Sequence, residues 1–314
     1  RSKKEEVELR AGLEAQGIDP DDYLAKEGEI PSGPPKFTAK GAEQELSETL
    51  AEGRANGVVI EPLEALLVDP KQHEAWHKAE ASYREGYRLA AHHQGEAPRL
   101  EGDAAAEARQ GFEQALAAGG DLTHLDLTGA DLSGLNLSGR DLSGAWMENA
   151  NLSGADLSGA NLEGAVLARA DLSATNLAGA KLQKANLSLA RCVETVADGA
   201  DLSGAILVKT HFAQASLKGV DLVGADIQEL EGPVADLSGA NLEKVAFLKT
   251  NLSGLRLTDA KLDGCQFLES DLSGVDLSGA SINGAAFVEC KADGARFDEA
   301  SMVRTYTPHF VVLY

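Results

Sequence analysis

From Asp121 to about Met302 the sequence repeats every five residues. Typical units read Ala-Asp-Leu-Ser-Gly, at 130–134 and 155–159, or Ala-Asn-Leu-Ser-Gly, at 150–154. A large apolar residue stands at the centre of nearly all 37 consecutive units, and a small residue usually precedes it by two places. Five residues match neither the period of an α-helix, about 3.6, nor that of a β-strand, about 2. The repeat therefore predicts a chain that turns a corner in every unit and points both apolar positions inward.

A second period of 20 residues is superimposed on the first. Most units have Gly two residues after the centre, but one set of eight units has none there. These units are centred on Met147, Leu167, Leu187, Leu207, Ile227, Phe247, Phe267 and Phe287. This spacing predicts four units per coil, with one face that differs from the other three and uses a different turn type.

The units resemble the pentapeptide repeat family, whose signature is Ala-(Asp/Asn)-Leu-X-X, and the resemblance covers about 180 residues. It implies an all-β fold, a right-handed quadrilateral β-helix with four pentads per coil. About nine coils, each about 4.8 Å high, would form a rod about 43 Å long. The units centred on Ala197 and Gly232 lack a large apolar residue and are expected to weaken the core locally.

Residues 1–118 lack the repeat and are predicted to form an α-helical region, and 119–304 the β-helix. The expected helices are Ser2–Gln16, a short piece from Pro20, Thr38–Ala55, Pro62–Val68, Lys71–His93 and 103–118. A linker rich in helix breakers, Ile30–Lys36, separates the second of these from the third. The last helix stops at Gly119-Gly120 and leads into the first pentad, so it is expected to cap the solenoid. The apolar tail, 305–314, is expected to cover the other end or to pair with a second copy.

The distinctive face carries large apolar residues at positions that point outward in the repeat. We call them the apolar stripe: Trp146, Val166, Ile206, Val208, Leu248, Leu268 and Val288. Contiguous apolar patches of this kind usually mark interaction surfaces. Three interpretations stay open: coverage by residues 1–118 or a sister subunit, binding of a foreign protein, and a mere preference of the backbone for β-branched residues.

Composition narrows the class of partner. A formal charge of −22 and a pI near 4.7 argue against binding nucleic acid through its phosphates. Three scattered cysteines fit neither a disulfide framework nor a zinc cage, and are expected to be buried thiols of a reducing compartment. No apolar run is long enough to span a membrane. We expect no cofactor, and a protein of the bacterial cytoplasm.

One motif suggests chemistry. The segment His73-Glu-Ala-Trp-His77 matches H-E-x-x-H, which on a helix places two imidazoles on one face and Glu74 beside a zinc-bound water. The metzincin continuation is missing, because Glu80 and Tyr83 stand where a metzincin has Gly and His. His92 and His93 remain as unusual candidates for a third ligand. Zinc-dependent hydrolysis is therefore a minor alternative, and packing of a helical stripe is favoured.

Two functions from different classes follow from the family resemblance. The first is a non-catalytic scaffold or adaptor, with the apolar stripe as its protein-binding face; residues 1–118 also resemble, weakly, segments of pentapeptide-tailed proteins associated with type VI secretion. The second is a DNA mimic that occupies gyrase, as some family members do. The repeat from 121 to 304 has 26 acidic and 14 basic residues, a net charge of −12, which permits mimicry. Mainly Leu centres, and acids interleaved with Asn and Lys, favour the scaffold.

Overall fold

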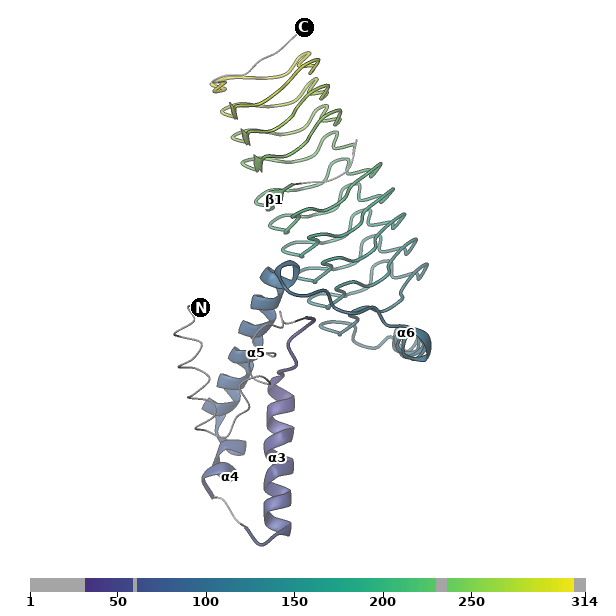
Figure 1. Cartoon of the computed structure of the whole chain (residues 1–314), viewed down its shortest axis with the longest axis vertical. Helices are drawn as coiled ribbons and strands as arrows, with labels where there is room; N and C mark the ends of the chain where they lie inside the picture. The colour runs from purple at the N-terminus through teal and green to yellow at the C-terminus, as the bar shows by residue number, and fades with distance from the viewer. Residues whose placement is uncertain (1–31, 59–60, 230–235, 308–314) are drawn as a thin grey trace, which may run out of the picture.

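The computed structural model describes residues 32–58, 61–229 and 236–307, and shows a group of helices followed by a stack of coils (Figure 1). The helices are α3 (Ala39–Ala55), α4 (Glu61–Val68), α5 (Pro70–Ala90), the short 3₁₀ helix η1 (Ala91–His93) and α6 (Gly102–Ala117). They confirm the helices predicted between 38 and 118 to within a few residues. The predicted helix Ser2–Gln16 and the piece from Pro20 lie outside the described residues.

Local signals set the helix ends. The Thr38 hydroxyl accepts a hydrogen bond from the Gly41 N–H and begins α3, while Asp69 caps α5 in the same way through the N–H of Lys71. Helices α3 and α5 lie side by side and form an arm that extends away from the coils (Figure 1). The Glu80 carboxylate joins them by accepting the N–H of Ala39 at 2.9 Å.

Successive coils pair in parallel with a constant offset. Every bridge recorded within the repeat joins residues 20 apart, such as Asp131 with Asn151 and Asn151 with Asp171. Four pentads per coil are thereby confirmed. On the distinctive face the last coils form a parallel sheet in the order β1-β2-β3-β4, with β1 (Ile227–Gln228), β2 (Ala246–Leu248), β3 (Gln266–Leu268) and β4 (Ala286–Val288).

The predicted change of turn type is confirmed in these last coils but wrong for the earlier coils of the same face. Around Met147, Leu167, Leu187 and Leu207 the chain keeps the turn pattern of the other faces. The expectation rested on the missing Gly. However, non-glycine residues at that place adopt the same left-handed backbone, with φ of 55° at Asn149 and 59° at Arg169. The absence of Gly therefore does not by itself change the turn.

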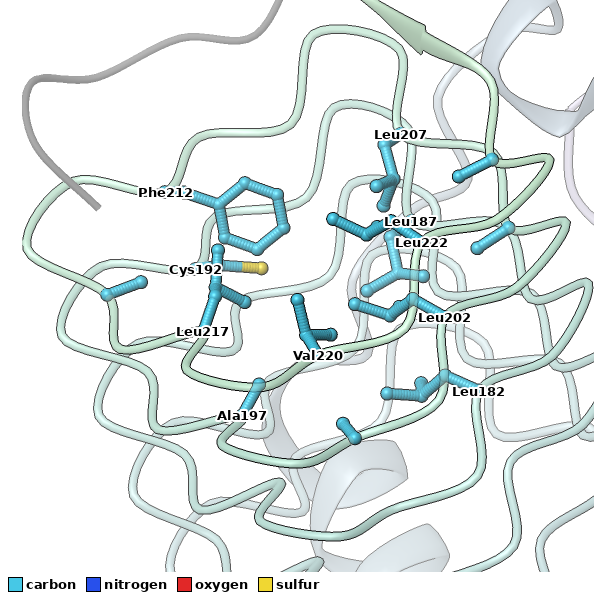
Figure 2. Close-up of a cluster of buried hydrophobic side chains, with 14 of the residues drawn as sticks. Leu182, Leu187, Cys192, Ala197, Leu202, Leu207, Phe212, Leu217, Val220 and Leu222 are labelled. Atoms are coloured by element: carbon cyan, nitrogen blue, oxygen red, sulfur yellow. The ribbon is translucent and has the colours of Figure 1, made fainter. Parts of the chain in front are cut away.

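The core is a continuous column of the predicted inward positions. Figure 2 shows Leu182, Leu187, Leu202 and Leu207, from two consecutive coils, pointing into it. The free thiols Cys192, Cys265 and Cys290 are buried as expected. Ala197 is buried within an uninterrupted ladder, so the break in the pattern does not break the coil. The unit centred on Gly232 lies outside the described residues.

Helix α6 lies at the open end of the first coil (Figure 1). Phe112 belongs to the same buried cluster as Leu122 and Leu127, and so closes the core. Arg109 donates to the carbonyl oxygens of Asp131 and Ser133, at 3.2 and 3.1 Å. One coil later, the equivalent carbonyl oxygens of Asn151 and Ser153 accept hydrogen bonds from backbone N–H groups of the preceding coil. The helix thus replaces both the apolar and the hydrogen-bonding contacts of a missing coil.

Outward Asp and Asn residues stabilise the corners. In many units their Oδ1 accepts the N–H of the residue two places later, as Asp131 does from Ser133 at 3.0 Å. Hydrogen bonds from the following Ser lower the pKa of the carboxyls of Asp131, Asp141 and Asp271 below their ordinary value of 3.8. The ionised form is therefore the one that stabilises the folded coil.

These carboxyls predict an acid-sensitive rod. A carboxyl whose pKa falls on folding contributes stability above its unfolded pKa, and this is lost as the pH drops through the folded pKa. We expect the melting temperature to change little between about pH 7 and 5 and to fall below about pH 4. Asn already occupies equivalent corners, so the triple variant Asp131→Asn, Asp141→Asn, Asp271→Asn should remain folded and show a smaller acid-induced fall. An equal fall in both proteins would contradict this assignment.

Candidate interaction surface

The apolar stripe is divided into two halves, and its first half is not exposed. Trp146, Val166 and Ile206 have exposed fractions of 6%, 0% and 8%. Tyr87 and Ala91, at the end of α5 and the start of η1, form one buried cluster with Trp146 and Val166. For Trp146 and Val166 this is the first of the interpretations left open by the sequence, coverage by residues 1–118. The chain's own helices pack on both of them.

Aromatic and cationic contacts reinforce this covered half. The ring centroid of Tyr87 lies 5.7 Å from that of Trp146, edge to face, and the Arg84 guanidinium carbon lies 4.4 Å from the indole centroid. These contacts use the outward-facing Trp146 as an anchor. This residue was singled out from sequence as a candidate for binding a partner, and within the described residues that partner is α5 of the same chain.

A buried polar cluster fixes the helices to the coils. The Glu148 carboxylate has no exposed surface, accepts a hydrogen bond from the Tyr87 hydroxyl, and pairs with Arg169 at 2.8 Å. Arg169 also donates to the carbonyl oxygens of Ala91, His92 and Gln94. Burial, together with the bond to Glu148, raises the pKa of Tyr87, which therefore remains a donor. The charged pair is almost fully desolvated and its polar groups are partnered.

Two asparagines extend this contact to either side. Asn149 donates to the carbonyl oxygen of Ala97 at 2.8 Å, and Asn186 donates to that of Arg88 at 2.6 Å. The sequence interpretation did not assign these docking contacts, although two of the residues involved, Glu148 and Arg169, depart visibly from the repeat. Glu148 stands where Ser dominates, and Arg169 stands where Gly dominates. Both exceptions fall on the face that carries the stripe.

The second half of the stripe is open. Leu248 has an exposed fraction of 43%, and Val208, Leu268 and Val288 are half-buried. Three of these four residues lie on strands β2 to β4, in register with one another. Their side chains therefore form a row on a parallel sheet, on the same face as the part that the helices cover.

Charged pairs border this open half. Lys209 lies 3.4 Å from Glu229, and Lys249 lies 3.7 Å from Glu269, each pair linking adjacent coils. All four side chains are at least 44% exposed, so each pair contributes little to stability. The two Lys–Glu pairs thus form a nearly neutral polar border beside the apolar row. An apolar centre with a polar rim is typical of protein interfaces.

The H-E-x-x-H motif lies on α5, away from the stripe contacts. The His73 ring nitrogen Nε2 is 2.7 Å from the carbonyl oxygen of Leu67, and the ring packs edge-on against Trp76. No group of three or more His, Cys, Asp or Glu side chains placed to hold a metal is found among the described residues. The geometry gives His73 a role in fixing α4 against α5, and does not bring a third ligand to Glu74 and His77.

Comparisons with known proteins agree with this architecture. The family model for pentapeptide repeats matches the chain in eight copies, over residues 112–144, 121–154, 150–188, 198–229, 235–271 and 270–305. These segments span more than half of the chain, and the protein belongs to the pentapeptide repeat family. The search of curated proteins finds no significant match.

Several solved structures show local similarity. HetL, a regulator of heterocyst differentiation from the cyanobacterium Nostoc, is 25% identical over 62% of this chain and 92% of its own, with a TM-score of 0.34. QnrB1, a plasmid-mediated fluoroquinolone resistance protein, is 20% identical over 60% and 93%, with a TM-score of 0.38. Rfr23 from the cyanobacterium Cyanothece is 20% identical over 65% and 99%, with a TM-score of 0.22. Among the described residues, no helix has the length and hydropathy of a membrane span.

Proposed function

We propose that the protein is a non-catalytic interaction scaffold whose binding face is the open half of the apolar stripe. The observation that carries this proposal is the division of one continuous face. Its first half already binds a helix of the same chain, and its second half presents Leu248, Leu268 and Val288 without a cover among the described residues. We also propose the right hand of the β-helix, which the family resemblance implies.

The occupant we propose is an amphipathic helix of a partner protein. The covered half offers the precedent, because α5 and η1 contact it through Tyr87 and Ala91, which are one helical turn apart. A partner helix with a similar pair of aromatic and small residues would continue this contact along β2 to β4. The alternating charges of Lys249 and Glu269 would lie beside it as a polar rim.

DNA mimicry receives less support from the surface. Asp236 pairs with Arg256 at 3.1 Å and Asp276 pairs with Arg296 at 3.5 Å, each across one coil. These basic residues interrupt the rows of acids that a phosphate-like surface would need. Measurable inhibition of gyrase supercoiling at low micromolar protein would favour mimicry over the scaffold.

The open half predicts a specific loss of binding. Leu248→Asp, alone or with Leu268→Asp, is expected to abolish co-purification of the partner because it places a charge in the apolar centre of the interface. The matched control is Val196→Asp, on another face. Val196 is 41% exposed, and the change restores the usual Asp of the repeat. Partner and stoichiometry would be read from crosslinks to Lys249 and from light scattering of the purified protein.

Each outcome is informative. Loss of a crosslinked partner in Leu248→Asp, with retention in Val196→Asp, supports the proposal. Equal capture by wild type and a folded Leu248→Asp would reject the open half as the binding face. A dimer that dissociates in Leu248→Asp would identify a second copy as the occupant and reject the partner helix.

A further inference from the structure

A polar groove lies between α5 and one corner of the first coils. Its volume is about 450 Å³, which is within the range of small-molecule sites. Gly144 and Gly164 occupy the same pentad position in consecutive coils and line the groove without side chains. His124 and Lys184 hold that position one coil before and one coil after, so each lies at one end of the glycine pair. Two consecutive coils therefore lack a side chain at this position beneath α5, and the space forms the groove.

The groove gathers cationic groups in an otherwise acidic protein. Arg84, Arg88 and Lys184 line it together with the His124 imidazole, against the two carboxylates Glu85 and Glu163. Arg88 is engaged, because it donates to both oxygens of Glu85 and to the carbonyl oxygen of Lys184. The Lys184 ammonium has no hydrogen bond or ion pair with any described residue. Its N–H groups are therefore open to a ligand, although its charge also acts on the Glu85 carboxylate.

Arg84 also lines the groove and carries a donor without a partner among the described residues. Its Nε donates to Glu80 at 3.2 Å and its guanidinium stacks on Trp146, but its Nη1 is buried and has no partner among the described residues. A buried guanidinium N–H without an acceptor costs free energy, so an acceptor is expected there. Stacking occupies the face of the guanidinium and leaves the N–H groups at its edge, which suit a planar or tetrahedral oxyanion.

We propose that this groove binds a small ligand through an oxyanion group, either a carboxylate or a phosphate. The Arg84 guanidinium and Lys184 Nζ are its donors, and the glycine pair provides the space. Trp146 is covered by Arg84 and Tyr87, so the ligand is held through charge and hydrogen bonds and not by stacking on the indole. The site is separate from the open half of the apolar stripe and does not depend on the proposed scaffold function.

The test is titration of the ¹⁵N-labelled protein with inorganic phosphate and, in a second arm, with succinate, at constant ionic strength. We expect saturable chemical-shift changes at the amides of Gly144, Gly164 and Lys184. A response to one anion alone, or to both, supports the site and identifies the preferred oxyanion. No saturable change at these amides with either anion would overturn the proposal.

Two pairs of variants separate this site from general anion effects. Lys184→Gln should weaken binding several-fold, while Lys244→Gln, in the same column three coils later, should not. Gly164→Gln fills the groove and should abolish binding, whereas Gly224→Gln, in the same column with open space around it, should not. Gln is tolerated in this left-handed position at Gln214, with φ of 58°.

The change Arg84→Gln should weaken binding about tenfold, because a charged hydrogen bond is lost. Equal binding by wild type, Gly164→Gln and Arg84→Gln would show that the anions bind elsewhere and would overturn the proposal. Because Gly164→Gln keeps every charged group, this conclusion does not depend on Arg84→Gln being folded.

Discussion

Replacing Arg169 with methionine is expected to release α5 and η1 from the coils. Glu148 would remain as a carboxylate without exposure and without its counter-charge, and the carbonyls of Ala91, His92 and Gln94 would lose their donor. Removing one partner of a buried ion pair typically costs about 3–5 kcal/mol. We therefore expect the docked helices to open while the coils remain folded.

Amide hydrogen exchange measures this effect directly. In Arg169→Met, exchange in α5 and η1 should be faster by about 100-fold or more, while the ladder in 236–307 should be unchanged. The control is Lys209→Met, at the same pentad position two coils later. Its ion pair with Glu229 is exposed, so its loss should cost less than about 1 kcal/mol.

A double variant separates the charge from the packing. Glu148→Leu combined with Arg169→Met leaves no buried charge and should recover part of the lost protection, as replacement of buried ion pairs often does. Unchanged exchange of α5 in the folded single variant would show that the polar cluster does not hold the helices.

The second large effect is expected in the core, at Phe267. Its ring has no exposed surface and is stacked between Phe247 and Phe287, with centroids 4.9 and 4.7 Å away. Phe267→Ala removes both contacts and leaves a cavity, which typically costs about 3–5 kcal/mol in the free energy of unfolding. In a repeat protein each coil contacts only its neighbours, so the loss should be concentrated in the coils that contain β2 to β4.

Urea unfolding followed by far-ultraviolet circular dichroism tests this prediction. Tryptophan fluorescence would not, because Trp76 and Trp146 lie in the first half of the chain. Leu268→Ala, the neighbouring outward position, is the control and should cost about 0.5–1 kcal/mol. Equal losses at the two positions would contradict the assignment of inward and outward residues.

The periodic part of this fold was predictable because each coil repeats the same physical problem. The small and large apolar positions fix which side chains point inward, and the 20-residue spacing fixes four units per coil. The distinctive face was also recognisable, since one residue in each of its units replaces Gly. These features recur many times, so no single exception obscures them.

Coverage of the stripe by residues 1–118 was one of the open interpretations, but the contacts that dock the helices were not predictable because each occurs once. Tyr87 and Ala91 are ordinary residues of a helical stripe, and nothing periodic links them to Trp146 or Val166. Glu148 and Arg169 were visible as departures from the repeat, but they are 21 positions apart. They become a pair only when the coils stack. The groove was not predictable either. Gly144 and Gly164 are typical of the repeat, and they line a groove only because α5 packs over them.

The division of the apolar stripe into a covered and an open half is tested most directly by thiol labelling of two variants, Val166→Cys and Leu248→Cys. The native thiols Cys192, Cys265 and Cys290 have exposed fractions of 0%, 0% and 3%, so their background should be low. We predict rapid labelling of Leu248→Cys. Val166→Cys should be protected, and should become labelled only when it is combined with Arg169→Met in the same protein. Equally rapid labelling of both thiols in the otherwise unchanged protein would contradict it.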